Sequence, residues 1–258
     1  MNNKLLNRVL LLNDDGIDAP GMLLLKNIAR SIANEVWVVA PAIDQSGVSC
    51  AVSLKAPFRA VQRSEHEYAI YGTPADCASF AIRYLMRDNL PDLVLSGINN
   101  GSNLGFETVL SGTVGGAMMA MVMGIRSIAF SQVTKEGSGI INWDVSEYYA
   151  KSVIEKLLNI NWPSHICMNV NFPNCEPQQV QGIRLTTQGD AEVDGLTITA
   201  VKDPENNNYF WFRAKHSDSI STPNRELDAT NLNYIAVTPL AYGRTDGLVY
   251  TQLQNEFN

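Results

Sequence analysis

The stretch RVLLLNDDG, residues 8–16, places a short apolar run directly before a turn that contains two aspartates. A continuous apolar run of this length, ended by turn residues, predicts a strand buried on both faces of a parallel sheet. The next segment has helical periodicity from about Pro20 to Ile32, and a second apolar strand is expected over Val36–Ala40. Strand, helix and strand in this order indicate a βαβ unit and the α/β class.

The same alternation of short apolar runs and longer amphipathic runs continues to about residue 171. It predicts helices over about 73–87, 112–123 and 144–158, strands over 92–96, 127–131 and 165–171, and shorter strands between 51 and 71. We therefore expect a Rossmann-like, mostly parallel sheet flanked by helices, formed by residues 1–178. Short runs at 183–187, 196–201, 209–213 and 234–238, separated by polar turns, then predict a β-rich extension over residues 179–258.

The aromatic run YFWF, residues 209–212, lies inside this extension. Four large rings left in water would be unfavourable, so we expect the run to be covered. Two surfaces could pack against the run: the core of the same chain, which is the ordinary outcome, or a second subunit.

Composition sets broad limits on function. The chain has 258 residues, 45% hydrophobic content and a formal net charge of −7, so it can bury a large core but lacks the excess of Lys and Arg that binding a nucleic-acid polymer requires. Its four cysteines form no Cys-x-x-Cys pair, and we expect reduced thiols. The polar residues 1–8 show no signal peptide, and the longest apolar stretch, Val114–Ile125, is too short to span a bilayer. We therefore expect a cytoplasmic protein without a membrane partner.

Polar turns follow the predicted strands, where ligands of open parallel sheets bind. Asp14 and Asp15 come directly after the first strand, and the repulsion between their carboxylates needs a compensating charge. Hard oxygen donors of this kind favour Mg²⁺, Mn²⁺ or Ca²⁺ over Zn²⁺, and Ser46 and Asn99 supply the same donor type from neighbouring turns. The alternative is an ordinary Asn-Asp-Asp-Gly turn in which one aspartate caps a helix.

Two further turns suit a phosphate. The loop SGINNGSNLG, residues 96–105, carries three glycines and three asparagines directly after a predicted strand, so its backbone can approach an anion closely. Ser111, Gly112 and Thr113 begin a predicted helix, where unpaired N–H groups and the helix dipole attract a phosphate. Simple helix capping and a surface connection are the competing interpretations. No Walker A, Gly-x-Gly-x-x-Gly, Gly-x-Ser-x-Gly or His-Glu-x-x-His pattern is present at a suitable place.

Several of these motifs occur together and in order: NDDGI at 13–17, SG at 46–47, GTPADC at 72–77, SGIN at 96–99 and SGTV at 111–114. As a set they resemble the SurE family, from about residue 8 to 240, and NVNFP at 169–173 and VTPL at 237–240 also match. The resemblance implies a metal-dependent 5'/3'-nucleotidase with a Rossmann-like core. It also implies a C-terminal extension that mediates oligomerisation, as a homodimer or homotetramer.

The resemblance assigns roles to individual residues. It implies one divalent cation per subunit, Mg²⁺ or Mn²⁺ with Ca²⁺ as a substitute in crystals, held by Asp14, Asp15, Ser46 and Asn99. It implies a phosphate bound by Asn103, Ser111, Gly112 and Thr113, with Asn13 shaping the turn or touching substrate. The catalytic residues would be Asp14 and Asp15, either of which could orient or deprotonate the attacking water.

The chain also departs from the family pattern. Leu110 replaces the usual Tyr, Met119 the usual Glu, and Phe106-Glu107 an Asp-Asp pair, which bears on substrate preference more than on metal binding. Two alternatives to a phosphomonoesterase therefore stay open: a noncatalytic nucleotide-binding or regulatory protein on the same scaffold, and a metal-dependent glycosyl or nucleotidyl transferase.

Overall fold

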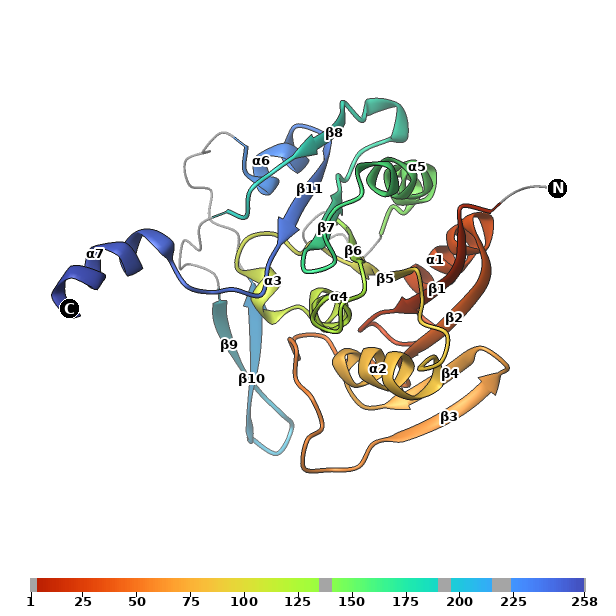
Figure 1. Cartoon of the computed structure of the whole chain (residues 1–258). Coiled ribbons are helices and arrows are strands. Elements are labelled where there is room, and N and C mark those ends of the chain that lie inside the picture. Colours follow the sequence, from red (N-terminus) through yellow and green to blue (C-terminus); the bar gives the residue numbers. More distant parts are fainter. Residues whose placement is uncertain (1–3, 135–140, 190–195, 215–223, 258) are drawn as a thin grey trace.

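A nine-stranded, mostly parallel sheet forms the centre of the molecule (Figure 1). The structure, a computed structural model, describes residues 4–134, 141–189, 196–214 and 224–257. The strand order in the sheet is β3-β4-β2-β1-β5-β6-β7-β11-β8. The strands of its first part are β1 (Leu6–Leu12), β2 (Ala33–Pro41), β3 (Arg59–Ser64), β4 (Glu67–Tyr71), β5 (Leu93–Asn100), β6 (Ser127–Gln132) and β7 (Cys167–Phe172). The α/β class and the mostly parallel sheet predicted from the sequence are confirmed.

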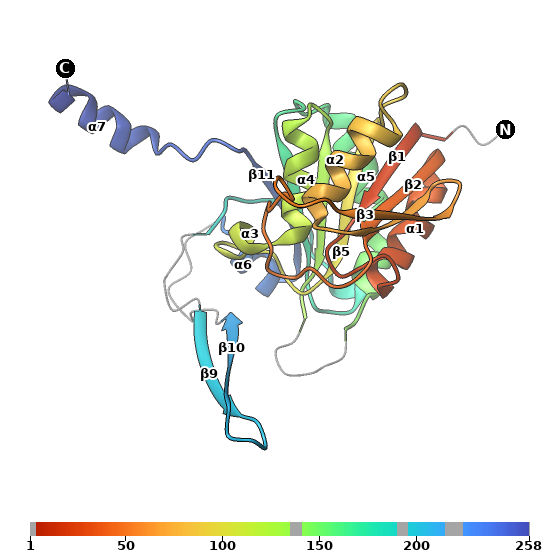
Figure 2. The ribbon, with the colours of Figure 1, turned by 90° about the horizontal axis from the view of Figure 1, so that it is seen from below.

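Helices cover both faces of this sheet (Figures 1 and 2). Helices α1 (Pro20–Ile32) and α5 (Asp144–Ile160) bury their apolar residues on one face. Helices α2 (Pro74–Phe80) and α4 (Gly112–Val122) pack on the other, and a π-helical turn, Ala81–Leu85, continues α2. Both layers follow from the sequence: β1 is apolar throughout its buried half because it has a helix layer on each side.

The predicted helix starts coincide with local signals in the structure. Pro20 and Pro74 occupy the first helical positions, where the missing N–H of proline is harmless. Thr73 and Asp76 form a capping box at the start of α2, with each side chain bonded to the backbone of the other residue. The loop before β3 also fixes this helix start, because Asp76 accepts from the Ser53 N–H at 2.9 Å and hydroxyl at 2.7 Å, and Thr73 Oγ1 donates to the Ala51 carbonyl at 2.5 Å.

The C-terminal region is organised differently from the prediction. Strands β8 (Gly182–Leu185) and β11 (Tyr234–Leu240) do not stand in a separate extension but complete the main sheet, β11 antiparallel to β7 and parallel to β8. The division expected at residue 178 therefore falls inside the sheet. Strands β9 (Leu196–Lys202) and β10 (Asn208–Ala214) form a two-stranded antiparallel ribbon, and helices α6 (Glu226–Asn231) and α7 (Gly247–Phe257) follow it.

The ribbon and α7 both project away from the body of the molecule (Figure 2). The four rings of the run 209–212 are 55 to 70% exposed, so of the two surfaces expected to cover them the core of the same chain is excluded and a second subunit remains. A two-stranded ribbon has two open faces, and because this one projects away from the body, its aromatic side chains stay exposed on both. In the described ranges, no helix is long and apolar enough to cross a bilayer.

Candidate metal and phosphate site

Three polar side chains that are far apart in the sequence meet at the carboxyl ends of β1 and β5. Thr113, in the first turn of α4, donates its hydroxyl hydrogen bond to Asp14 Oδ1 and lies 3.2 Å from Asn99 Oδ1. Asp14 is only 3% exposed and Thr113 is fully buried. The structure thus brings Asp14, Asn99 and Thr113 together. The sequence predicts this arrangement, because it places their separate turns at one edge of the sheet.

An irregularity at the end of β5 places Asn99 in this cluster. The pairing of β5 with β6 shifts register between Ser96 and Asn99, and Gly97 has φ +135°, a conformation that favours glycine. A Cβ at Gly97 would lie 2.4 Å from the Phe130 carbonyl oxygen. The strand can therefore bulge towards the site only with glycine at this position.

The other two predicted metal ligands lie beside the cluster. Asp15 accepts a hydrogen bond from the Asn100 backbone N–H at 3.1 Å, and the Gln45 N–H donates to the Asp14 carbonyl at 2.8 Å. The second bond brings the loop that carries Ser46 against the turn after β1. Ser46 itself is exposed, with its backbone N–H on Asp44 Oδ1 at 2.7 Å. Four oxygen-bearing residues from three turns therefore surround one region.

The electrostatics of this region favour a cation. Burial raises the pKa of Asp14 to about 6, against hydrogen bonds from Thr113 that lower it, and burial also raises the pKa of Asp15. No Lys or Arg of the described ranges forms an ion pair with either carboxylate. Nor do three or more His, Cys, Asp or Glu gather anywhere in the part of the chain described. A cation here would depend on amide and hydroxyl oxygens as well as on the two carboxylates.

Two observations bear on whether the residues fit a hard divalent cation. Asn13 Nδ2 donates to the Gly16 carbonyl at 2.6 Å, whereas its buried Oδ1 has no hydrogen-bond partner within the described ranges. All candidate ligand atoms are oxygens, the donor type of Mg²⁺ and Mn²⁺ sites. An unsatisfied acceptor next in sequence to a buried and a partly buried carboxylate fits a site completed by a cation and its water.

The start of α4 packs directly on Asp14. A Cβ at Gly112 would lie 2.7 Å from Asp14 Cβ and 2.8 Å from its Oδ2, so only glycine allows the carboxylate to reach the helix N-terminus. Ser111 accepts a hydrogen bond from the Val114 N–H at 3.0 Å and caps the helix. The capping interpretation of Ser111 is therefore true, and it is compatible with a phosphate at the same helix end.

Asn103 is held in a buried polar network rather than facing the carboxylates. Its side-chain amide donates to Ser131 Oγ at 2.7 Å, its backbone N–H donates to Asn171 Oδ1 at 2.9 Å, and its carbonyl accepts from Asn169 at 2.8 Å and Asn171 at 3.1 Å. Ser131, Asn169 and Asn171 had no predicted role in the site. Their signal in the sequence is the presence of polar residues at the ends of otherwise apolar strands.

Two departures from the family pattern have local explanations. Met119 is partly buried and packs against the apolar cluster under α2 and α4. A nonpolar packing contact therefore takes the place of the acidic group usual in the family. Leu110 takes part through its backbone, whose carbonyl accepts from the Ser49 N–H at 2.9 Å. Neither side chain contacts the carboxylates.

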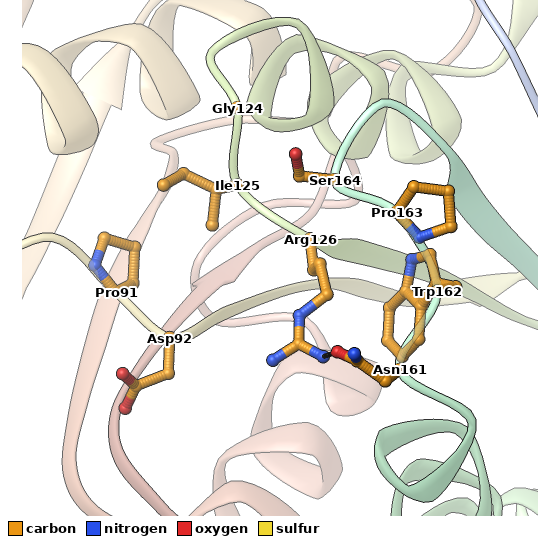
Figure 3. Close-up of a pocket in the computed structure, with 9 residues that line it drawn as sticks. All are labelled: Pro91, Asp92, Gly124, Ile125, Arg126, Asn161, Trp162, Pro163 and Ser164. Carbon is orange, nitrogen blue, oxygen red and sulfur yellow. Dashed lines mark hydrogen bonds between the residues drawn. The ribbon is translucent and has the colours of Figure 1, made fainter.

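A separate cavity of about 380 Å³ opens at the other edge of the sheet (Figure 3). Pro91 and Ile125, at the amino ends of β5 and β6, line it together with Arg126 and Trp162. The Arg126 guanidinium lies over the Trp162 ring at 5.3 Å and donates to Asn161 Oδ1 at 3.3 Å. This cavity does not belong to the site built by Asp14, Asn99 and Thr113.

Comparison with known proteins gives consistent matches over most of the chain. A family model described as Survival protein SurE matches residues 9–195. A protein of Burkholderia lata named 5'-nucleotidase SurE 1 is 43% identical over 250 residues, covering 97% of this chain and 96% of that protein. A 5'-nucleotidase SurE of Methylorubrum populi is 43% identical over 93% of this chain and 94% of its own length. The crystal structure of the SurE protein from Aquifex aeolicus superposes with a TM-score of 0.82 at 32% identity, covering 97% of this chain and all of that one.

Proposed function

This chain belongs to the SurE family, and from that membership we propose that it is a divalent-metal-dependent phosphatase that hydrolyses nucleoside 5'- and 3'-monophosphates to nucleoside and phosphate. The relatives compared above are named 5'-nucleotidases. The observation that carries the proposal for this chain is the convergence of Asp14, Asn99 and Thr113 at the N-terminus of α4. Carboxylate, amide and helix terminus together provide for both a cation and a phosphate.

Asp14, Asp15, Ser46 and Asn99 would hold the cation, one per subunit and Mg²⁺ or Mn²⁺ by donor type. Bound there, a divalent cation supplies charge stabilisation at the phosphoryl oxygens and acidifies a bound water. One of the two aspartates orients or deprotonates the attacking water. Hydrogen bonds aimed at charge that develops in the transition state are the main service a protein can offer phosphoryl transfer.

The phosphate is bound in this proposal by the start of α4 and by the glycine loop. Gly112 and Thr113 lie in the first helical turn, where N–H groups point away from the helix. Ser111 caps the same helix end, the resemblance adds Asn103 of the glycine loop, and Asn13 shapes the turn after β1 through its bond to Gly16. Because these donors are fixed by the sheet and the helix, little reorganisation is needed when the substrate binds.

The test is phosphate release from 5'-AMP and 3'-AMP by wild-type protein, with Mg²⁺, with Mn²⁺ and after treatment with EDTA. We expect release with either cation, loss of release with EDTA and recovery when the cation is restored. Asp14→Asn should abolish release without unfolding the protein. Asp18→Asn is the matched control, since Asp18 is an exposed aspartate paired with Arg63 at 2.5 Å outside the site.

Other results would contradict the proposal. Nucleotide binding without phosphate release by the wild type would favour the noncatalytic alternative, and release that is indifferent to EDTA would remove the metal. Transfer products in place of nucleoside and phosphate would favour a transferase.

The exposed ribbon supports a second part of the proposal, that the protein is a homodimer or homotetramer. Aromatic side chains stand on both faces of β10, and their partners on β9, Ile198 and Val201, are also exposed. An apolar surface of this kind is unfavourable in water unless it is covered. A second copy of the chain is the cover that the family resemblance implies. The cytoplasmic location stays a prediction.

A further inference from the structure

Two side chains from the C-terminal half of the chain hold the end of the glycine loop. The Gly105 backbone N–H donates to Glu226 Oε1, and the Gly105 carbonyl accepts from Gln188 Nε2 at 2.9 Å. Glu226 begins α6 and Gln188 lies just beyond β8, more than eighty residues from Gly105 in the sequence. Both polar backbone groups of one loop residue are therefore held by side chains from outside the loop.

Glu226 is an unusual residue to find fully buried, with 0% exposure. Its second oxygen accepts from the Thr238 hydroxyl at 2.9 Å, and Thr238 lies 2.7 Å from the Thr186 hydroxyl. A buried carboxylate is unfavourable unless hydrogen bonds replace its lost water. Those bonds join the main sheet at β11 to Gly105, so the carboxylate acts as a rigid link between the two.

The link reaches the phosphate-binding region through a short piece of chain. Gly105 stands two residues from Asn103, which β7 holds from the other side through Asn169 and Asn171. Glu107, beyond Gly105, accepts from the Leu104 N–H at 2.8 Å and from Ser102 Oγ at 2.9 Å. Asn103 is thus positioned between two anchors, β7 and the pair Gln188 and Glu226.

The segments that carry Gln188 and Glu226 are also bonded to each other. Gln188 precedes β9 and Glu226 follows β10 in the sequence. The Thr187 N–H donates to the Asn224 carbonyl at 2.9 Å, and the Glu226 N–H donates to the Thr187 carbonyl at 3.3 Å. The Gln188 amide also donates to Thr108 Oγ1 at 2.7 Å. Residues 187–188, residues 224–226 and the end of the glycine loop therefore share one hydrogen-bond cluster.

We propose that Gln188 and Glu226 are positioning residues that hold Asn103 for phosphate binding. The effect on turnover rests on the proposed function; the effect on the loop does not. Weakening the hydrogen bonds of Gly105 removes one of the two restraints on Asn103, while Asp14, Asp15 and the other proposed metal ligands stay in place. The expected signature is weaker phosphate binding with little change in kcat, because ground state and transition state lose the same contact.

The experiment compares Glu226→Ala, Glu226→Gln and Thr238→Val in the full-length protein. We expect Glu226→Ala to raise KM for AMP and Ki for inorganic phosphate by roughly tenfold with kcat within about twofold. Glu226→Gln retains an acceptor for Gly105 and a donor for Thr238, and should keep KM close to wild type. Thr238→Val disturbs the same buried network away from Gly105, and should lower the melting temperature without changing KM.

Gln188→Ala guards against a Glu226→Ala protein that does not fold. Gln188 is exposed, so its loss leaves the core intact, and we expect a smaller rise in KM in the same direction. Unchanged KM and Ki in Gln188→Ala, or an equal rise in KM in Thr238→Val and Glu226→Ala, would overturn the proposal.

A readout that needs no turnover separates this inference from the proposed function. Amide hydrogen exchange of peptides covering residues 101–106 should become faster in Gln188→Ala and Glu226→Ala than in wild type. Inorganic phosphate should bind each variant more weakly, measured by calorimetry. If the wild type releases no phosphate from nucleotides, the proposed function fails, while these two measurements still decide whether the pair holds the loop.

Discussion

Asp14 occupies a position where burial, hydrogen bonding and a proposed cation compete for one carboxyl group. Burial in the fold raises the pKa of Asp14 to about 6, whereas in an unfolded chain it loses its proton near pH 4. Since the folded-state pKa is the higher one, the stability contributed by protonated Asp14 is present at low pH and is lost as the pH rises through about 6. A cation needs the ionised form, so proton and cation exclude one another.

Mn²⁺ affinity should therefore depend on pH with a known sign. We expect affinity to fall by about tenfold for each pH unit below about 6, and to level off above it, as one proton is displaced per cation bound. Electron paramagnetic resonance of free Mn²⁺ at pH 5, 6, 7 and 8 measures this. Asp14→Asn, which cannot ionise, should bind weakly without that slope. Equal affinity of the wild type at pH 5 and pH 7 would be incompatible with Asp14 as a ligand.

Residue-level prediction succeeded where position along a strand was enough. Asp14 and Asn99 were expected at strand ends on one edge of the sheet, and they meet there through Thr113. Glu226 could not be predicted from its surroundings, because its partner Gly105 is 121 residues away and the intervening ribbon carries no periodic signal for that contact. From the sequence alone, a buried glutamate that accepts from a distant backbone N–H cannot be distinguished from an exposed glutamate at the start of a helix.

At the scale of elements, α1 approaches the end of β5 very closely at Gly21. A Cβ at Gly21 would lie 1.9 Å from the Ile98 carbonyl oxygen and 3.2 Å from the Trp143 ring, so α1 can approach the strand only with glycine there. Ile98 is the residue before Asn99, so this helix also braces the bulge that carries a proposed metal ligand.

Gly21→Ala should consequently destabilise the fold, by about 1–3 kcal/mol as expected for overpacking. Chemical denaturation gives the free energy of unfolding directly. Gly243→Ala provides a reference, because a Cβ at Gly243 has no neighbour within 4 Å. Equal unfolding free energies for Gly21→Ala and Gly243→Ala would show that α1 shifts without strain.

The elements themselves were predictable to different degrees. Helices α1 and α2 begin where Pro20 and Pro74 indicate, since capping and proline act within one turn. The assignment of β8 and β11 to an extension was wrong because the sequence of a short strand does not reveal its partner. Strand β11 pairs with β7 although β8, the ribbon and α6 lie between them in the sequence. Helix α7 was not predicted, as its apolar residues are exposed and form no clear stripe.

At the scale of the whole molecule, the ribbon is the surface through which we propose that copies of the chain meet. Phe210 and Phe212 stand on one face of β10 and are 63% and 70% exposed. Replacing both by serine should reduce the proposed oligomer to a smaller species in light scattering coupled to size-exclusion chromatography. Secondary structure by circular dichroism should be retained, because neither ring contributes to the core.

Leu54→Ser is the control for general effects of removing exposed apolar surface, since Leu54 is 87% exposed on the body of the molecule. It should leave the mass unchanged. A ribbon variant with the mass of the wild type would show that assembly uses another surface.

The place of β11 in the sheet has a consequence for biosynthesis. This strand, Tyr234–Leu240, is inserted between β7 and β8, so both of them lack a neighbour until almost the entire polypeptide has left the ribosome. A nascent chain in which strands β1–β7 have already formed their sheet still exposes the unpaired edge of β7 to any other nascent chain nearby. Translation that stops after β7 and before β11 leaves that edge permanently open, the kind of exposed strand edge that chaperones and proteases act on.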